Sequence, residues 1–337
     1  MKSGKAKPTF IDLFAGIGGF RAGMDHAGFH HLYSNDWDKY ASQTYAAWYG
    51  PEKHSCKSIW EAIAADEIPK HDLLCGGFPC QPFSNAGKRL GFQDNRQGNL
   101  FFAIQNIVET KRPKVVFLEN VRTLKGHDGG MTFQTINNSF EDLGYRQTHE
   151  IINAKFWVPQ KRVRIFMVYF DKNLFSIEDI QNFQAVLSEL KTGNGKKVKE
   201  FSSIIEADPD KSFQIPQGTW DSLNRHRERH RREGRGFGFN LIEDFSHPTN
   251  TLSARYAKDG AEILIKQRYW RRPRKITLNE AKKLMGFTSK YASFYGHPKK
   301  QGFPVGICSN TQSYKQFGNA VVPHLIEEIA NLIHKYI

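Results

Sequence analysis

The sequence contains no apolar run that approaches the roughly 18 residues needed to span a bilayer. Its first residues, Met1 to Lys7, are basic, and no apolar signal core follows them. Cysteine is scarce, and Cys56, Cys75, Cys80 and Cys308 form no CxxC pair and have no histidine at zinc-finger spacing. These absences argue against a membrane protein, a disulfide framework and a structural zinc site. We therefore expect a cytosolic protein without a metal ion.

Acidic residues are fewer than basic residues in this chain. The chain has 337 residues with 48 Lys and Arg against 34 Asp and Glu, a net charge of +14 and a pI of about 9.5. Its length suggests about two domains. The hydrophobic share of 39% is enough for a sizeable core. The positive excess favours a polyanionic partner, nucleic acid first and an anionic membrane surface second, although a merely soluble basic protein also fits.

The stretch 76–84, GGFPCQPFS, has the features of a reactive site. The apolar run Asp72–Cys75 predicts a short buried strand, two glycines end it, and Pro79 stiffens the backbone before Cys80. Ligands of open α/β sheets bind at that end of a strand. The polar stretch 85–99 predicts a mobile loop beside the cysteine. Cys80 is either a nucleophile or a small buried core residue.

A second candidate edge lies near the N-terminus. Residues 9–14, TFIDLF, predict a strand, AGIGGF follows at 15–20, and a helical pattern continues to about Ala27. A strand, a glycine turn and a helix start are typical of a nucleotide or cofactor site, although any tight turn favours glycine. The pattern is not GxGxxG, so a dinucleotide is not the first expectation.

Acidic residues follow the next predicted strand, residues 31–35. Asp36 lies about 20 residues after the glycines, where a carboxylate commonly binds ribose hydroxyls. Asp38 is better placed to cap the helix predicted over 39–48. Trp37, between them, either stacks on a base or fills core.

Charged residues also follow two later strands. Glu119 comes after the strand predicted over 114–118, at the same sheet edge as Cys80, where it either functions or caps the next segment. Arg162 and Arg164 precede a strand at 165–170, and their spacing points both the same way in an extended chain. Together they would clamp an anion or a carbonyl oxygen, unless they are ordinary surface charge.

Residues 191–199, KTGNGKKVK, predict a linker, and the next hundred or so residues look irregular. Six arginines and two glutamates lie between positions 225 and 235, the densest positive charge in the chain. This run predicts contact with DNA phosphates, or else a solvated helix face.

The motifs taken together resemble the C5-cytosine DNA methyltransferases of bacterial restriction-modification systems. The matching stretches are FAGIGGF at 14–20, GFPCQPFS at 77–84, ENV at 119–121, QKRVR at 160–164 and QFGNAVVP at 316–323. The resemblance implies an α/β fold, a mostly parallel sheet flanked by helices, of the class I S-adenosylmethionine-dependent type. It also implies a catalytic domain at 1–190 plus 274–337 and a smaller irregular, β-containing target-recognition domain at 191–273.

The resemblance also assigns site residues. As catalytic residues it implies Cys80 as nucleophile, Glu119 as acid, and Arg162 and Arg164 on the flipped cytosine. As S-adenosylmethionine contacts it implies Phe14, Gly16, Gly18, Gly19, Asp36, Trp37, Ile59, Pro79 and Asn319. As DNA contacts we expect Ser84, Lys88, Arg89, Arg225, Arg227, Arg229, Arg231, Arg232 and Thr251.

The family often has Glu where this chain has Asp36, and the shorter arm must still reach the ribose. A family Asp that pairs with the adenine amino group falls near Ser58 and Ile59, so that contact is in doubt here. The implied partners are double-stranded DNA and a restriction endonuclease acting on the same site, with no membrane. We expect a monomer in the bacterial cytoplasm, associated with the nucleoid.

Three other functions compete with this hypothesis. A tRNA cytosine methyltransferase of the same family would carry a Cys-Phe-Thr stretch, which this sequence lacks. A catalytically silent DNA-binding relative would not need the intact set of Cys80, Glu119 and Arg164. An NAD-dependent oxidoreductase is disfavoured by the glycine pattern and by the basic second half.

Overall fold

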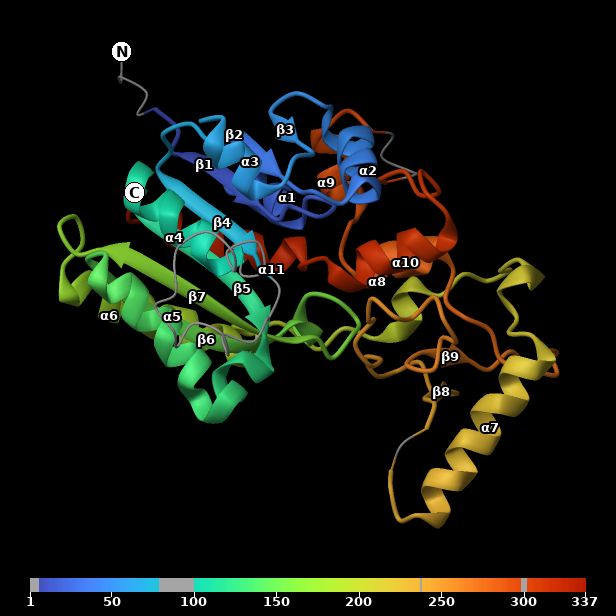
Figure 1. Cartoon of the computed structure of the whole chain (residues 1–337). Coiled ribbons are helices and arrows are strands. Elements are labelled where there is room, and N and C mark those ends of the chain that lie inside the picture. The colour runs from blue at the N-terminus through green and yellow to red at the C-terminus, as the bar shows by residue number, and fades with distance from the viewer. Residues whose placement is uncertain (1–5, 79–99, 237, 298–301) are drawn as a thin grey trace. The chain divides into compact units, whose positions relative to one another are not determined.

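The computed structural model describes residues 6–78, 100–236, 238–297 and 302–337 (Figure 1). Backbone contacts divide the chain into two compact units. The first comprises Met1–Asn153, Val163–Gly195 and Pro323–Ile337, and the second comprises Ala154–Arg162 and Lys196–Val322. The division into catalytic and target-recognition domains is a functional one and stays a prediction.

The first unit contains a seven-stranded sheet in the order β3-β2-β1-β4-β5-β7-β6 (Figure 1). Its strands are β1 (Thr9–Leu13), β2 (His30–Asn35), β3 (His54–Ser55), β4 (Leu73–Gly77), β5 (Val115–Val121), β6 (Tyr145–Asn153) and β7 (Val163–Asp171). The pairings among β1 to β5 are parallel, and β7 runs antiparallel to both β5 and β6. The mostly parallel sheet predicted from the sequence is confirmed.

Helices cover both faces of this sheet. They are α1 (Gly19–His26), α2 (Lys39–Tyr49), α3 (Ile59–Ala64), α4 (Leu100–Lys111), α5 (Met131–Asp142), α6 (Ile177–Glu189) and α11 (Pro323–His334). On one face, Ile104 of α4 and Phe140 of α5 join the core with Val116 of β5. On the other, the rings of Phe20 in α1 and Phe117 in β5 meet edge to face at 5.2 Å. The strands are apolar on both sides because both sides are buried.

The strand that carries Glu119 is longer than the sequence suggests. We predicted that it ends at Leu118, but β5 continues to Val121. The extra residues pair with the antiparallel strand β7, in which Ile165 lies opposite Asn120 and Arg164 opposite Val121. Glu119 is therefore held within the sheet by ladder pairing and does not begin a loop.

The second unit consists mainly of short elements. They are α7 (Gln217–Arg232), β8 (Leu241–Ile242), β9 (Leu264–Ile265), α8 (Leu278–Leu284), α9 (Ser289–Phe294) and α10 (Asn310–Asn319). Strands β8 and β9 pair in parallel, and Ile215, Leu223 and Leu264 form a small apolar cluster. The stretch that looked irregular in sequence thus contains the 16-residue helix α7. None of the described helices is long and apolar enough to cross a membrane.

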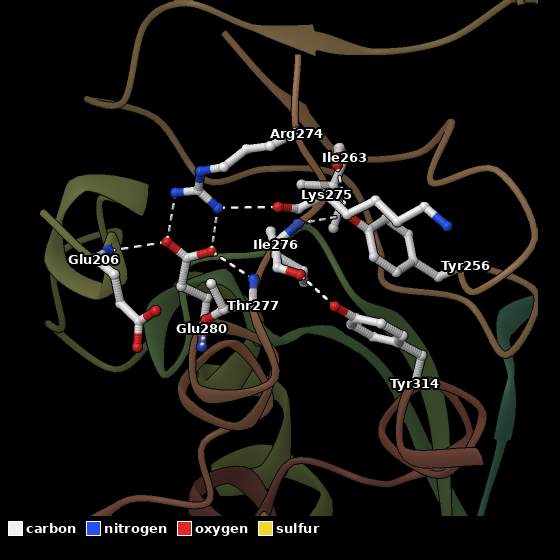
Figure 2. Close-up of polar contacts among 9 residues, drawn as sticks. All are labelled: Glu206, Tyr256, Ile263, Arg274, Lys275, Ile276, Thr277, Glu280 and Tyr314. Atoms are coloured by element: carbon white, nitrogen blue, oxygen red, sulfur yellow. Dashed lines mark hydrogen bonds and ion pairs between the residues drawn. The ribbon is translucent and has the colours of Figure 1, made fainter. Parts of the chain in front are cut away.

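A buried ion pair organises the end of this unit (Figure 2). The guanidinium of Arg274 donates to both carboxylate oxygens of Glu280 at 2.7 Å, and both side chains are 0% exposed. Glu280 also accepts hydrogen bonds from the backbone N–H groups of Glu206 (2.9 Å) and Thr277 (2.8 Å). These bonds use most of the hydrogen-bonding capacity of the pair and so offset the cost of burying two charges, although Nε of Arg274 has no partner among the described residues.

We predict that Glu280→Ala lowers the free energy of unfolding by about 3–5 kcal/mol, because it leaves the Arg274 charge buried without its partner. The matched control is Glu243→Ala, which breaks the exposed ion pair with Lys266 (2.8 Å) in the same unit and should cost less than about 1 kcal/mol. Urea denaturation of the three proteins measures the difference. Equal losses in the two variants would contradict the structural role of the buried pair.

Candidate active site

The chain leaves β1 through a tight turn into α1. The backbone φ angle is positive at Phe14 (56°), Gly16 (55°) and Gly18 (76°), a conformation that costs least at glycine. A Cβ on Gly18 would lie 2.2 Å from the ring of Tyr49, and the Tyr49 hydroxyl donates to the Gly18 carbonyl at 2.6 Å. The Tyr49 side chain thus holds the turn in its left-handed conformation at the end of β1.

The two acidic residues after β2 have different partners. Asp36 accepts hydrogen bonds from the backbone N–H of Gly16 and of Asp38, both at 2.8 Å, and so ties the end of β2 to the glycine turn. Asp38 caps α2, as predicted, by accepting from the N–H groups of the helix's first turn. Trp37 is 73% exposed, which leaves its indole face accessible beside the Asp36 carboxylate.

Ile59 and Asn319 were also predicted cofactor contacts. Ile59 is only 3% exposed and belongs to the hydrophobic core of the first unit. Asn319 ends α10 and is exposed, and its neighbours Gly318 and Ala320 are both buried. Pro79, predicted for the same site, lies outside the described residues, as do Cys80, Ser84, Lys88, Arg89 and the loop predicted at 85–99.

Glu119 on β5 and Arg164 on β7 form an ion pair, with 3.0 Å between a carboxylate oxygen and the guanidinium Nε. The register explains this contact, because Glu119 lies opposite Phe166 and Arg164 is two residues from Phe166. Residues so related are diagonal neighbours on one face of an antiparallel pair. Both side chains are largely buried, at 10% and 17% exposed, so each charge depends on the other.

The register also brings Glu119 to the strand that leads toward Cys80. Gly77, at the end of β4, pairs with Glu119, and Cys80 follows three residues later in the sequence. The side-chain amide of Asn120 donates to the carbonyl of Phe78 at 2.9 Å. Asn120 therefore anchors the last described backbone before Cys80, a role that the sequence analysis did not assign.

Cys75 shows what an inert thiol in this sheet looks like. It is fully buried on β4 and donates to the Ile11 carbonyl at 3.2 Å. Burial raises the pKa of the Cys75 thiol well above its usual value. Since only a thiolate is a strong nucleophile, Cys75 is not a candidate for covalent chemistry.

Arg162 has other partners than the Glu119–Arg164 pair. Its side chain is 2% exposed within the second unit, and its guanidinium donates to the carbonyls of Leu252 (3.1 Å), Gly318 (2.9 Å) and Ala320 (2.7 Å). These bonds hold the backbone at Leu252 and at the residues on both sides of Asn319. The interpretation of the two arginines as arms of one clamp finds no support in these contacts.

Residues next to Arg162 in the sequence also hold Thr251, and they do so through their backbone groups. The Thr251 hydroxyl donates to the Lys161 carbonyl at 2.6 Å, and the Lys161 N–H donates to the Thr249 carbonyl at 2.8 Å. Gln160 is fully buried and donates to the Leu284 carbonyl at 2.7 Å. Gln160, Lys161 and Arg162 thus hold the backbone of residues 249–252 and the end of α8 within their own unit.

The sequence matches the family described as C-5 cytosine-specific DNA methylase over residues 8–335. The type II methyltransferase M1.ScrFI of Lactococcus lactis subsp. cremoris is 43% identical over 328 residues, which cover 96% of this chain and 77% of that protein. M.HhaI of Haemophilus parahaemolyticus is 36% identical, with 95% and 92% covered.

The chain belongs to the C-5 cytosine-specific DNA methylase family. It is a DNA (cytosine-5-)-methyltransferase, as the motif resemblance implied. The solved structure of the S. pombe Dnmt2 methyltransferase superimposes with a TM-score of 0.67 at 17% identity, covering 97% of each chain, and supports the fold alone.

The arginine run of this methylase lies on α7. Arg225, Arg229 and Arg232 are exposed and share one helix face by their spacing. Arg227 has a packing contact, because its guanidinium lies 4.2 Å from the ring centroid of Phe239. A cavity of about 730 Å³ lies beside the C-terminal half of the helix. The residues that line it include Arg227, Arg231, Arg235, Asn240 and Glu262.

Behind the glycine turn of the methylase lies a buried polar network on α1, α2 and β2. Arg21 donates to the Tyr45 hydroxyl at 2.9 Å, and that hydroxyl is 3.5 Å from Nε2 of His31. Burial lowers the pKa of His31 to about 2, and the positive charges of Arg21 and Lys53 add to the effect. His31 is therefore neutral in the folded methylase at any ordinary pH.

We predict that the methylase loses stability as the pH falls below about 6.5, the ordinary pKa of an unfolded histidine. Below this pH the unfolded chain binds a proton at His31, whereas the folded chain does not. The stability present above this pH is therefore lost progressively toward lower pH. The variant His31→Phe should flatten the curve by about 1.4 kcal/mol per pH unit between pH 4 and 5.5. Urea denaturation at several pH values tests this, and parallel curves for the two proteins would refute it.

Proposed function

We propose that this enzyme methylates C5 of one cytosine within a specific DNA sequence and so protects DNA from a restriction endonuclease that cuts the same site. The Glu119–Arg164 pair carries this proposal, because it lies beside the strand that leads to Cys80. The type II names of the relatives add the restriction-modification context. The enzyme would act as a monomer on double-stranded DNA in the bacterial cytoplasm, without contact to the endonuclease.

The residues around the glycine turn fit S-adenosylmethionine. Asp36 already accepts two backbone N–H groups, but a carboxylate has about four lone-pair sites, so it can also accept ribose hydroxyls. The exposed indole of Trp37 offers a face for the adenine ring. When bound, S-adenosylmethionine supplies an electrophilic methyl group. Gly16, Gly18 and Gly19 would hold it with Phe14 and Pro79, and Asn319 would contribute its exposed amide.

The reaction needs a nucleophile because C5 of cytosine is unreactive on its own. In this proposal the Cys80 thiolate forms a bond to C6, and the electrons of the C5–C6 double bond make C5 nucleophilic. After C5 has gained its methyl group, a base removes the C5 proton. The electrons of that C–H bond re-form the double bond, and the C6–S bond breaks to return the thiolate. The sequence assigns no residue as this base, and in this proposal a water molecule accepts the proton.

Glu119, protonated at this step, would donate a hydrogen bond to N3 of the cytosine and so make C6 more electrophilic. Arg164 fixes the position of the Glu119 carboxylate and has further donors for a carbonyl oxygen of the base. Reaching these groups requires that the cytosine leave the duplex, which costs a few kcal/mol. Phosphate contacts from the α7 arginines, with Thr251 and the residues Ser84, Lys88 and Arg89, would offset that cost.

We predict that Cys80→Ala abolishes methyl transfer while leaving the DNA dissociation constant within a few fold, since the thiol acts only in catalysis. Glu119→Gln should lower kcat by about 10²- to 10⁴-fold, the usual contribution of a positioned acid. The measurement is transfer of tritium from labelled cofactor to DNA, and Lys335→Ala, at an exposed position in the last residues of the chain, is the control. Persistent turnover in Cys80→Ala would overturn the nucleophile assignment.

The same assay tests the substrate. Label entering DNA but not tRNA supports DNA methylation, whereas label in tRNA alone would contradict it. Bisulfite sequencing of DNA from cells that express the protein would then identify the methylated site. A catalytically silent relative would transfer no label, and bisulfite sequencing would find no methylated site.

A further inference from the structure

Residues 266–273, KQRYWRRP, form a closed loop that we name the basic arm. Its base is a two-way backbone pair, in which Ile265 N–H donates to the Arg274 carbonyl at 2.9 Å and Arg274 N–H donates to the Ile265 carbonyl at 3.0 Å. Near its tip the Trp270 N–H donates to the Gln267 carbonyl at 3.2 Å, which places Arg268 and Tyr269 at the centre of a turn.

The basic arm combines four cations with two aromatic residues and contains no acidic residue. Arg268 and Arg271 are exposed, and Tyr269 is 85% exposed. The guanidinium of Arg268 lies 5.4 Å from the Tyr269 ring centroid. An isolated exposed side chain is ordinary, but an exposed tyrosine between arginines on a constrained turn is the composition of a nucleic-acid contact.

The four cations have different roles. Arg272 donates to the Ile215 carbonyl at 2.8 Å and to the Gln217 side chain at 3.0 Å, and Lys266 pairs with Glu243 at 2.8 Å. These two side chains fasten the two sides of the basic arm to the body of the unit. Within the part of the chain that the structure describes, Arg268 and Arg271 have no ion pair, so both charges are available to a ligand.

The base of the basic arm is rigid because Arg274 is the residue of the buried ion pair with Glu280 (Figure 2). Around it, the Tyr256 hydroxyl accepts from the Ile276 N–H at 2.8 Å and the Lys275 ammonium donates to the Ala257 carbonyl at 2.7 Å. A loop whose base is already ordered loses less conformational freedom on binding than a free loop does.

We propose that the basic arm is a second contact to the DNA backbone, in which Arg268 and Arg271 each neutralise a phosphate and the Tyr269 hydroxyl donates to a phosphate oxygen. The proposal rests on DNA as the substrate and adds a surface that α7 does not provide. A membrane surface fits less well, because the strength of binding there scales with the apolar area that is buried as well as with charge, whereas the basic arm exposes one large aromatic ring among charges.

The contact between Arg272 and Gln217 places the basic arm at the first residue of α7. The arginine run begins at Arg225, about 12 Å along the helix at 1.5 Å per residue. That distance equals several phosphate spacings of a DNA strand at about 3.4 Å each. The basic arm and the arginine run would therefore contact different phosphates, and their effects on binding should add.

The test is DNA affinity as a function of salt for the full-length enzyme and the double variant Arg268→Ala/Arg271→Ala. Each lost phosphate contact should reduce the slope of log Kd against log salt by about 0.9, so the variant should lose about 1.8. The loss should be equal for duplexes with and without the methylation site. The control Lys7→Ala/Lys335→Ala removes two exposed cations from the first unit and should leave the slope unchanged.

Two further variants sharpen the result. Tyr269→Phe keeps the ring and should weaken DNA binding by a few fold, because only the hydroxyl is lost. Arg268→Gln/Arg271→Gln keeps most of the side-chain length, so it must reproduce the change in slope if the alanine variant unfolds. Thermal unfolding of each protein reports on its folding.

An unchanged slope in a variant that still methylates DNA would overturn the proposed DNA contact of the basic arm, while leaving the proposed function of the enzyme intact. A loss confined to the duplex that contains the methylation site would indicate base reading and would also overturn the backbone assignment. Arm-dependent binding to anionic phospholipid vesicles, with DNA binding unaffected, would favour a membrane contact instead. If the unaltered enzyme neither bound nor methylated DNA, the proposed function itself would fail.

Discussion

The ion pair between Glu119 and Arg164 is the interaction on which the polar end of the sheet in the first unit depends. Two charges that are 10% and 17% exposed survive in a sheet because they lie 3.0 Å apart. Their contact requires β7 to run antiparallel beside β5, since this register alone makes them diagonal neighbours. Strand β7, which breaks the parallel order of the sheet, therefore also positions this ion pair beside β5.

The second unit also contains buried charged side chains that are held by polar contacts. Its paired strands are two residues long, and apolar side chains such as Leu252, Ile276 and Phe287 are fully buried, so polar contacts add to the order that apolar packing gives. Arg274 is buried against Glu280, and Arg162 is buried against three backbone carbonyls. Guanidinium suits this role because its planar fork of donors can satisfy several acceptors at once. A lysine at either position could not replace that geometry.

Sequence reasoning reached the fold class because glycine turns and apolar strands recur in the order typical of an open α/β sheet. It also separated Asp38, which caps α2, from Asp36, which contacts the glycine turn. It offered a solvated helix face as an alternative for the arginine run but did not delimit α7, because a helix with one buried residue among many charges has little apolar period to detect. The end of β5 was misplaced because antiparallel pairing with a strand more than 40 residues later extends it.

Long-range partners were the least predictable part of the site. Tyr49 lies 31 residues from Gly18, and no local pattern links a tyrosine to a turn at that distance. Asn120 did carry a signal, since a polar side chain in a buried strand needs a partner, and that partner is the carbonyl of Phe78. Arg162 looked like a substrate contact because spacing alone cannot show that carbonyls from two distant segments converge on it.

In the proposed mechanism, the carboxyl ends of β4 and β5 and the amino end of the antiparallel strand β7 bring a thiolate, a carboxyl group and a guanidinium to one pyrimidine. The most direct measurement uses duplex DNA with 5-fluorocytosine at the methylated position, where fluorine replaces the hydrogen that must leave last. We expect the protein and the DNA strand to remain covalently joined in the presence of S-adenosylmethionine, and mass spectrometry of the digested adduct to locate the link at Cys80. An adduct on Cys56 or Cys308, or no adduct from an enzyme that methylates ordinary DNA, would contradict the account.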